Sequence, residues 1–324
     1  MSNKQKTLAS LSFAAVLAAG VLAAPAAMAD VTVYSAGPAG LINALAKGFT
    51  DKTGVKVNVF QGTTGQVMAR IEAEAANPVV DVLISASWDT ATDFASRDWL
   101  VPYTSPNAAN VPDFLKTETA VAQGVSALGI AWNPKSNTPK PADWADLTKP
   151  EYKDLVNLPD PAQSGASFEL VAALQNAAGN WKLFEDLKAN GAVVAGANAQ
   201  ALNPVLQGAK AAVFGAVDYI SLGQQKKGES IEVIFPSSGT VIAPRPMMIL
   251  KWTKQADDAK KFIDYVLSDE GQTAVAKVYL IPARSDIKAD RPLMKDIKLL
   301  DADSAALNSK REEILAAFGK IFAK

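Results

Sequence analysis

After residue 30 the apolar positions of the chain alternate between two spacings. Short β-like runs occupy 31–37, 55–60 and 79–84, and apolar residues at helical spacing separate them, as at Leu41 and Phe49. Strand, helix, strand, helix, strand in this order is typical of βαβ units. The pattern therefore predicts an α/β fold with a mainly parallel sheet.

The same alternation continues through the rest of the chain. A short irregular helical stretch is predicted at 144–153. Further apolar strands are predicted at 127–132, 156–161, 211–217, 231–235 and 247–252. Further helices are predicted at 168–178, 256–267, 269–278 and 305–322.

Three small, hydroxyl-rich loops follow the first three strands. They read Ser-Ala-Gly at 35–37, Gly-Thr-Thr-Gly at 62–65 and Ser-Ala-Ser at 85–87. The carboxyl ends of parallel strands line the ligand crevice in such folds, and two of these loops lead into helix N-termini, which favour anions. Ordinary turn and cap chemistry explains each loop singly, but three in succession favour a polar or anionic ligand.

A fourth segment of this kind, Gln-Ser-Gly-Ala-Ser at 163–167, opens the helix predicted at 168–178. Two interpretations are open. Ser164 or Ser167 caps the helix by accepting a hydrogen bond from a backbone amide, or the unpaired amides bind a phosphate or carboxylate. Taken alone, this motif favours the cap.

The N-terminal segment predicts export. Lys4 and Lys6 precede an apolar run at 8–24, and Ala-Met-Ala precedes Asp30, which is the pattern of a cleavable signal peptide over 1–29. No later apolar run reaches the roughly 20 residues needed to span a bilayer. We therefore expect a periplasmic protein whose mature chain begins at Asp30.

Composition narrows the chemistry. Without Lys4 and Lys6 the chain keeps 30 basic against 33 acidic residues, so nothing in its charge predicts a nucleic-acid partner. It contains no histidine and no cysteine, which excludes Ser-His-Asp and Cys-His catalysis, imidazole metal sites and disulfides. We expect no cofactor, no metal and no catalytic residue.

With these features in place, the sequence resembles the substrate-binding component of a bacterial ABC importer. It is most similar to the cluster of periplasmic ferric-ion-binding proteins and their hexose-phosphate and phosphonate-binding relatives. The resemblance is carried by VTVYSAGPAGL and FTDKTGVKV near the start, by NPVVDVLISAS, by SGAS, and by APRPMMILK followed by AKKFIDYVLSDEGQ.

This resemblance implies a two-lobed periplasmic binding protein of type II, with a cleft between the lobes and closure by hinge motion. The two crossing hinge strands are placed near 126–130 and 240–247. Lobe 1 is expected at 30–126 and 246–292, and lobe 2 at 127–245 and 293–324. The implied partners are a small anionic ligand and an inner-membrane ABC permease, with the protein itself a monomer.

The resemblance also separates two ligand classes. Ferric-binding members hold the metal with a histidine, a glutamate and two adjacent tyrosines. The corresponding places here are Pro38, Gly65, Asp218 and Tyr219, of which only Tyr219 keeps its type. The phosphate-binding turn of those members is retained at 164–166. An organophosphate, either a sugar phosphate or a phosphonate, is therefore expected, and ferric ion with a synergistic anion is the alternative, with Tyr219 and Asp218 as its ligands.

Ligand contacts are expected from loop amides and hydroxyls, with Asp218 accepting hydrogen bonds from a sugar hydroxyl or an ammonium group. Arg245 has two interpretations, a partner for phosphate or for a carboxylate at the hinge, and Trp88 covers a sugar face or packs in the core. An enzyme on the same fold is the alternative functional class. The predicted ligand-binding residues are Ser35, Ala36, Thr63, Thr64, Gly65, Gln66, Ser87, Ser164, Gly165, Ala166, Asn198, Asp218, Tyr219 and Ser238.

Overall fold

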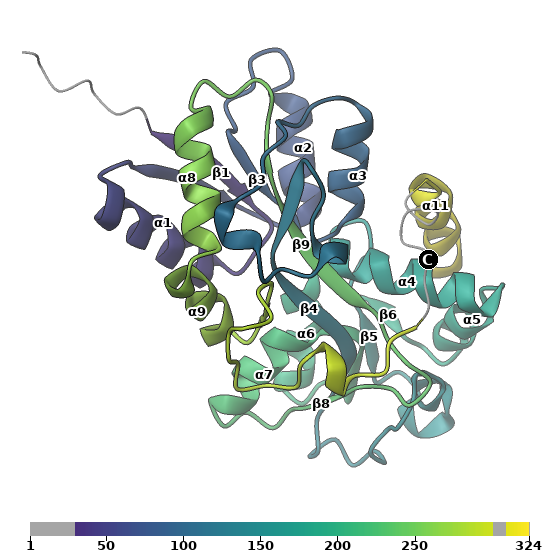
Figure 1. Ribbon diagram of the computed structural model, residues 1–324. Helices are drawn as coiled ribbons and strands as arrows, with labels where there is room; N and C mark the ends of the chain where they lie inside the picture. Colours follow the sequence, from purple (N-terminus) through teal and green to yellow (C-terminus); the bar gives the residue numbers. More distant parts are fainter. Residues whose placement is uncertain (1–29, 301–308, 324) are drawn as a thin grey trace, which may run out of the picture.

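The computed structural model describes residues 30–300 and 309–323, which form two lobes joined by long strands (Figure 1). The predicted signal peptide at 1–29 and the first residues of the predicted C-terminal helix, 305–308, lie outside the described residues. In the part of the chain that is described, no helix is both long enough and apolar enough to cross a membrane.

Lobe 1 contains the predicted βαβ units. Its parallel strands lie in the order β2, β1, β3, and the helices that connect them cover the sheet. Its elements are β1 (Val31–Ser35), α1 (Ala39–Thr53), β2 (Val57–Gln61), α2 (Thr64–Ala73), β3 (Val82–Ile84), α3 (Asp89–Ser96), α8 (Ala256–Val266), α9 (Asp269–Lys277) and β10 (Ile281–Pro282).

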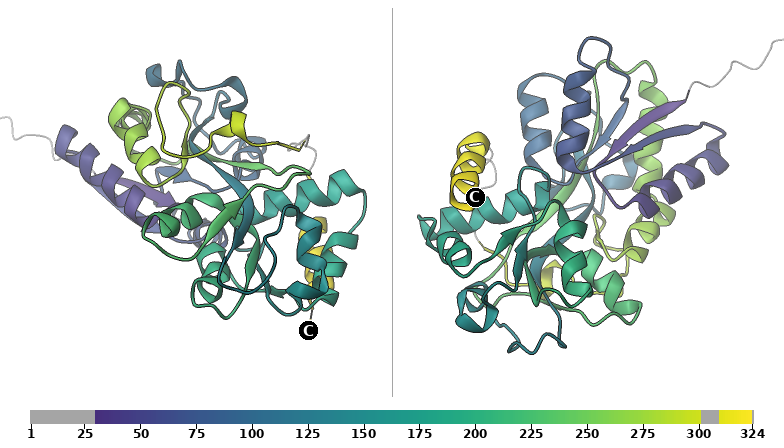
Figure 2. Two further views of the ribbon diagram at one scale, coloured as in Figure 1. Left: turned by 90° about the horizontal axis from the view of Figure 1, so that it is seen from below. Right: turned by 180° about the vertical axis from the view of Figure 1, so that it is seen from behind.

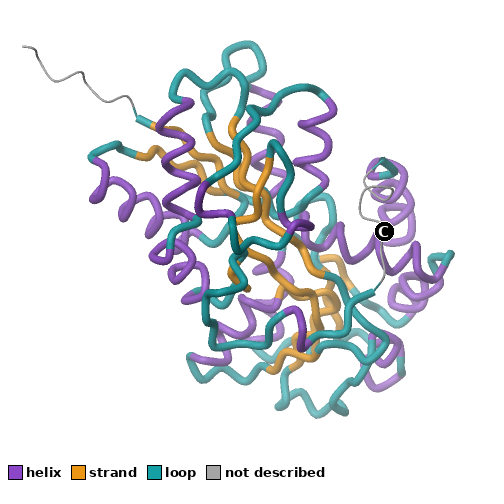
Figure 3. The backbone as a smooth tube through the Cα atoms, viewed as in Figure 1, coloured by secondary structure: helices purple, strands orange, loops and turns teal. Residues whose placement is uncertain are grey.

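Two long strands connect the lobes, β4 (Ala120–Trp132) and β9 (Ile242–Ile249), which pair antiparallel (Figure 3). The first half of β4 pairs with β9 and β10, and its second half pairs with β7 and β8. All residues of β4 are buried. The predicted lobes and crossing strands are confirmed, but the prediction of a mainly parallel sheet is corrected, because these two strands make the ten-stranded sheet mixed.

Lobe 2 has a second parallel segment in the strand order β7, β5, β6. The predicted irregular stretch is present as short 3₁₀ turns at 144–148 and 150–152. The sequence patterns missed α5, α6 and α7, which are short. The elements are β5 (Val156–Leu158), α4 (Gly165–Ala178), α5 (Lys182–Ala189), β6 (Val193–Val194), α6 (Asn198–Leu206), β7 (Ala212–Val217), α7 (Asp218–Lys226), β8 (Glu232–Ile234) and α11 (Arg311–Phe322).

Each lobe has its own apolar core. One buried cluster draws on residues within 31–125 and 247–283, and another on residues within 128–243 together with Ile314 and Phe318 of α11. Helix α11 packs on α5, where the rings of Phe318 and Phe184 meet edge to face with centroids 5.7 Å apart (Figure 2). The lobe boundaries themselves remain a prediction.

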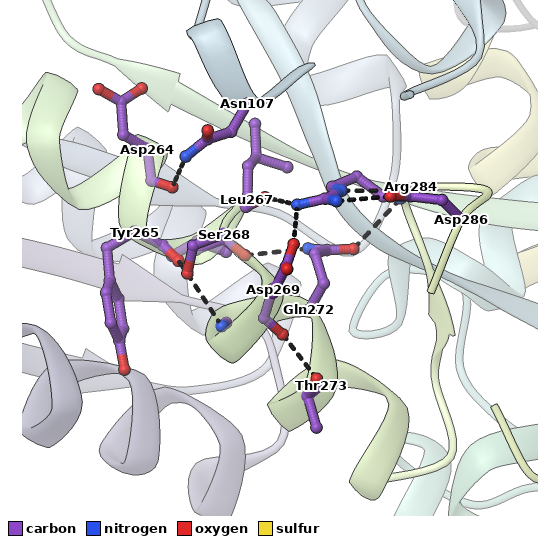
Figure 4. Close-up of polar contacts among 12 residues, drawn as sticks. Asn107, Asp264, Tyr265, Leu267, Ser268, Asp269, Gln272, Thr273, Arg284 and Asp286 are labelled. Carbon is purple, nitrogen blue, oxygen red and sulfur yellow. Dashed lines mark hydrogen bonds and ion pairs between the residues drawn. The ribbon is translucent and has the colours of Figure 1, made fainter. Parts of the chain in front are cut away.

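The segment from 284 to 300 leaves the α8–α9 corner and makes a third connection between the lobes. Arg284 fixes its start, donating to Asp286 and to the Leu267 carbonyl and pairing with Asp269 (Figure 4). Further along, Thr240 and Leu299 form a parallel bridge beside β9. Three segments of chain therefore link the lobes: β4, β9 and residues 284–300.

Candidate functional site

The three small loops of lobe 1 lie side by side, as the sequence predicted for the ends of parallel strands. Gly62 N–H donates to the Ser35 carbonyl at 3.1 Å, and Gln61 Nε2 donates to the Gly37 carbonyl at 3.0 Å. Ala36 N–H donates to the Ile84 carbonyl at 2.8 Å. That amide is thus used within the sheet and is not available to a ligand.

The segment 163–167 of lobe 2 lies directly against these loops. Gly165 N–H donates to Thr64 Oγ1 at 3.3 Å, and Gly65 N–H donates to the Gln163 carbonyl at 3.4 Å. We call the place where 35–37, 62–65 and 85–88 meet 163–169 the lobe junction. It brings together residues that are about 100 positions apart in sequence.

Two helix N-termini face each other at the lobe junction. Helix α2 of lobe 1 begins at Thr64, and helix α4 of lobe 2 begins at Gly165. The backbone amides of Thr64 and Ala166 have no acceptor among the described residues. Since each helix N-terminus carries a partial positive charge, the junction is electropositive.

Small residues are required where the lobes touch. A Cβ atom on Gly165 would lie 2.7 Å from Ser87 Cβ, and one on Gly65 would lie 2.9 Å from the Ala162 carbonyl oxygen. Both distances are shorter than real Cβ contacts, so only glycine fits at these two positions. The small-residue pattern that drew attention in the sequence thus reflects close approach of the lobes.

Several predicted hydroxyls act as helix caps. Thr63 and Gln66 form a capping box on α2, and Ser164 Oγ accepts from Ser167 N–H at the start of α4. Ser164 Oγ also donates to Asn198 Oδ1 at 3.0 Å. The capping interpretation of Ser164 is therefore confirmed, and the donors left for a ligand at this turn are backbone amides.

Glu169 links α4 to lobe 1 and was not predicted. Its Oε1 accepts from Ser87 Oγ at 2.5 Å and from Trp88 N–H at 3.1 Å. Burial raises the pKa of Glu169 to about 7, with a further contribution from the Asp89 carboxylate. Arg311 of α11 pairs with Asp89 across the same contact. Trp88 itself is partly buried and packs against the apolar cores of lobe 1.

Asp218 has a different role from the one predicted. Its side chain is fully buried and forms an ion pair with buried Arg291 at 2.5 Å. It also accepts from Ala127 N–H at 3.0 Å and from Tyr219 N–H at 2.7 Å. Three internal donors occupy the carboxylate, so we do not retain Asp218 among the proposed ligand contacts.

Arg245 lies at the lobe junction, on β9. Its side chain is 1 % exposed, and its Nη2 donates to the Ala36 carbonyl at 2.5 Å. The Tyr219 ring lies beside it, with its centroid 6.0 Å from Arg245 Cζ. Among the described residues no carboxylate pairs with Arg245, and its Nε has no hydrogen-bond partner. The interpretation of Arg245 as a hinge ion pair is therefore corrected.

Ser238 does not join the other predicted residues. It is exposed, and its hydroxyl and amide both donate to the Asp143 carboxylate, at 2.6 and 2.7 Å. Within the described ranges there is no group of three or more acidic side chains arranged to hold a metal ion. Apart from the single carboxyl of Glu169, the lobe junction therefore offers amides, a guanidinium and a phenol.

Glu169 and Arg291 were not predicted as functional residues, but the sequence does contain a feature that points to Glu169. Glu169 is the single charged residue between 164 and 178, in a helix that is otherwise apolar, and such a charge in a buried segment requires a polar partner. Arg291 carried no comparable signal, because its partner Asp218 is 73 positions away.

Comparisons with known proteins show which proteins this chain is similar to. The sequence profile described as "Bacterial extracellular solute-binding protein" matches residues 77–310. A candidate 2-aminoethylphosphonate-binding periplasmic protein of Salmonella typhimurium is 24% identical over 249 residues, covering 74% of this chain and 73% of the relative. The major ferric iron-binding protein of Neisseria meningitidis is 26% identical over 280 residues, covering 82% and 83%.

The fold has a counterpart among solved structures. The periplasmic binding protein AfuA of Actinobacillus pleuropneumoniae, with fructose-6-phosphate bound, superposes with a TM-score of 0.83 at 23% identity. The match covers 91% of this chain and 98% of that one. At this identity the likeness concerns the fold alone.

Proposed function

Because the chain belongs to the family of bacterial extracellular solute-binding proteins, we propose that it captures a small anionic organophosphate between its lobes. The ligand is a sugar phosphate or a phosphonate, and closure about the crossing strands encloses it for delivery to an inner-membrane ABC permease. The protein binds without chemistry, as its relatives do. Its named relatives bind phosphonate, sugar phosphate or iron, so the ligand class has to be argued from the junction.

The observation that carries the proposal is the meeting of the α2 and α4 N-termini at the lobe junction. Two positive helix ends that approach each other repel, and an anion between them removes that repulsion. The amides of Thr64 and Ala166, which have no acceptor among the described residues, are suitable donors to phosphoryl oxygens. Ser35, Thr64 and Tyr219 supply neutral groups at the same place.

The ferric alternative is less well supported. Asp218, which would replace one of the family's metal-binding tyrosines, is occupied by Arg291. Gly65, which stands at the position of the metal-binding glutamate, has no space for a side chain beside the Ala162 carbonyl. Tyr219 lies next to the positive charge of Arg245, which disfavours a trivalent cation there.

Thermal unfolding tests the proposal. The protein is unfolded to release any ligand carried through purification, refolded, and heated with fructose 6-phosphate, glycerol 3-phosphate, 2-aminoethylphosphonate, inorganic phosphate or ferric citrate. A ligand at about one hundred times its dissociation constant adds about 2.7 kcal/mol to the free energy of unfolding. This corresponds to a rise of about 5 °C or more in the midpoint.

We expect such a rise with at least one organophosphate and none with ferric citrate. A rise with ferric citrate alone, accompanied by the red-brown colour of an iron–tyrosinate complex, would contradict the proposal and support iron at Tyr219. No rise with any compound in the panel would contradict both ligand classes.

A further inference from the structure

Arg245 is a buried positive charge with no carboxylate partner among residues 30–300 and 309–323. A guanidinium group carries five N–H donors and stays charged at any physiological pH. Here the described residues provide one hydrogen bond, from Nη2 to the Ala36 carbonyl, and no ion pair. Burying such a group without a counter-ion is costly, so a ligand that supplies the missing acceptors would be bound strongly.

The other buried arginines of the chain show that this isolation is not general. Arg291 is fully buried and pairs with Asp218, and Arg284 is largely buried and pairs with Asp269 and Asp286 (Figure 4). Both also donate to backbone carbonyls. Arg245 thus differs from them in lacking a carboxylate partner among the described residues, although it too is buried.

Arg245 and the α2 N-terminus flank the same short loop. Arg245 holds the 35–37 loop through the Ala36 carbonyl, while Gln61 and Gly62 hold it from the side of α2. Gly37 of the same loop lies close to the guanidinium, because a Cβ atom there would be in ordinary van der Waals contact with Arg245 Nη2, at 3.4 Å. The guanidinium and the helix N-termini therefore belong to one site.

Their charges indicate which anion suits this site. The guanidinium carries one full positive charge, and the α2 and α4 N-termini each contribute about half a charge. With the buried Glu169 carboxyl of the same junction protonated, the sum is about +2, which matches a dianion better than a monoanion. We propose that Arg245 determines ligand specificity at the lobe junction by pairing with the dianionic phosphoryl or phosphonyl group of the ligand, in preference to a carboxylate. This inference rests on the proposed function.

Calorimetric titration of the refolded protein tests this assignment with matched pairs of compounds. Each phosphoryl compound is compared with the carboxylate of similar shape: 2-aminoethylphosphonate with β-alanine, and glycerol 3-phosphate with glycerate. The wild type is expected to bind one phosphoryl member at least about tenfold more tightly than its carboxylate partner. If it binds neither phosphoryl compound, nor fructose 6-phosphate, the proposed function itself fails.

The variant Arg245→Met then isolates the guanidinium. We expect it to weaken binding of the phosphoryl compound about 30-fold or more, and to remove most of the preference over the carboxylate. The control Arg97→Met removes the same charge from an exposed pair at the C-terminal end of α3 and is expected to leave affinity within twofold. Binding by Arg245→Met within threefold of the wild type overturns the assignment while leaving the proposed function intact.

Stability separates a ligand role from a structural one. Without ligand, Arg245→Met is expected to be at least as stable as the wild type, because it removes an unpaired buried charge. Loss of affinity together with a large loss of stability would overturn the assignment. If Arg245→Met does not fold, Arg245→Lys provides the test instead. Lysine keeps the positive charge but lacks the planar guanidinium that can donate two hydrogen bonds to one phosphoryl group, so we expect about tenfold weaker binding at unchanged stability. Unchanged affinity in that variant also overturns the assignment.

Discussion

Two buried arginines lie near the crossing strands, and their surroundings differ in one respect. Arg291, on the segment that returns between the lobes, meets the Asp218 carboxylate at 2.5 Å, with both side chains fully buried. Arg245, on β9, meets the Ala36 carbonyl and a tyrosine ring but no carboxylate among the described residues. We call Asp218 and Arg291 the hinge pair and contrast it with the lobe junction around Arg245.

The difference shows how a structural charge can be told from a binding charge. The hinge pair is complete within the chain, so its contribution is to stability and to the position of α7 against β4. The lobe junction is incomplete among the residues that the structure describes, with a guanidinium that has no ion pair and helix amides that have no acceptor. Changes at the hinge pair should therefore affect unfolding, and changes at the junction should affect binding.

The largest effect is expected at the hinge pair. Asp218→Ala leaves Arg291 buried without a counter-ion and should lower the free energy of unfolding by about 3–5 kcal/mol, measured by urea denaturation. The control Asp290→Ala removes the exposed partner of Lys226 and should cause only a small fraction of that loss. Equal losses in the two variants would show that the hinge pair contributes no more to stability than an exposed ion pair does.

A smaller effect, on binding alone, is expected at the point of closest contact between the lobes. Gly165→Ala places a Cβ atom 2.7 Å from Ser87 Cβ, so the lobes can no longer close fully. Overpacking of this kind costs about 1–3 kcal/mol, which corresponds to a loss of about 5- to 140-fold in ligand affinity. Titration calorimetry measures the affinity, and small-angle scattering measures the degree of closure.

The matched control for that change is Gly40→Ala. Gly40 lies in the first turn of α1, and a Cβ atom added there would have no neighbouring atom within 4 Å, so the new methyl group meets open space. It should leave affinity unchanged. Full affinity in Gly165→Ala would mean that the lobes do not approach each other this closely when ligand is bound.

The smallest effect is expected from pH. Burial raises the pKa of Glu169 to about 7 when the lobes are in contact, from 4.5 in water, so Glu169 takes up a proton as they close. Closure, and with it affinity, should therefore weaken as pH rises from 5 toward 7 and level off above 7, with a loss of about tenfold between pH 6 and pH 8.

The ligand phosphoryl group also ionises near pH 6 and opposes this trend, so Glu169→Gln provides the comparison. The amide oxygen can still accept from Ser87 and Trp88 but does not titrate. The difference between wild type and Glu169→Gln across pH 5 to 8 reports Glu169 alone. Identical pH profiles would exclude a change in its protonation on closure.

The sequence allowed accurate prediction of local features. Apolar spacing and turn chemistry predicted the βαβ start and the small loops at the strand ends. They also predicted the helices at 256–267 and 269–278, whose bounds agree with those in the structure to within a few residues. The 163–167 turn also contacts the 62–65 loop, and its role in ligand binding stays a prediction. Those loops consist of small residues because the lobes meet there.

Features that depend on distant pairing could not be predicted from the sequence. The antiparallel crossing of β4 and β9 joins residues more than 100 positions apart, which periodicity does not register. Asp218 looked like a free strand end because its partner, Arg291, comes 73 residues later. Arg245 was undecided for the same reason, since no local pattern indicates whether a carboxylate will lie beside it.

The division of the two cores along the chain has a consequence for the order in which the protein can assemble. The core of lobe 2 draws mostly on one continuous stretch, 128–243, whereas the core of lobe 1 also needs residues 247–283. On a chain that emerges N-terminus first, lobe 1 therefore appears first but has to wait, with β3 unpaired on one edge until β9 arrives. Lobe 1 therefore cannot complete its sheet until most of lobe 2 has emerged, and lobe 2 receives the last part of its own core only with α11.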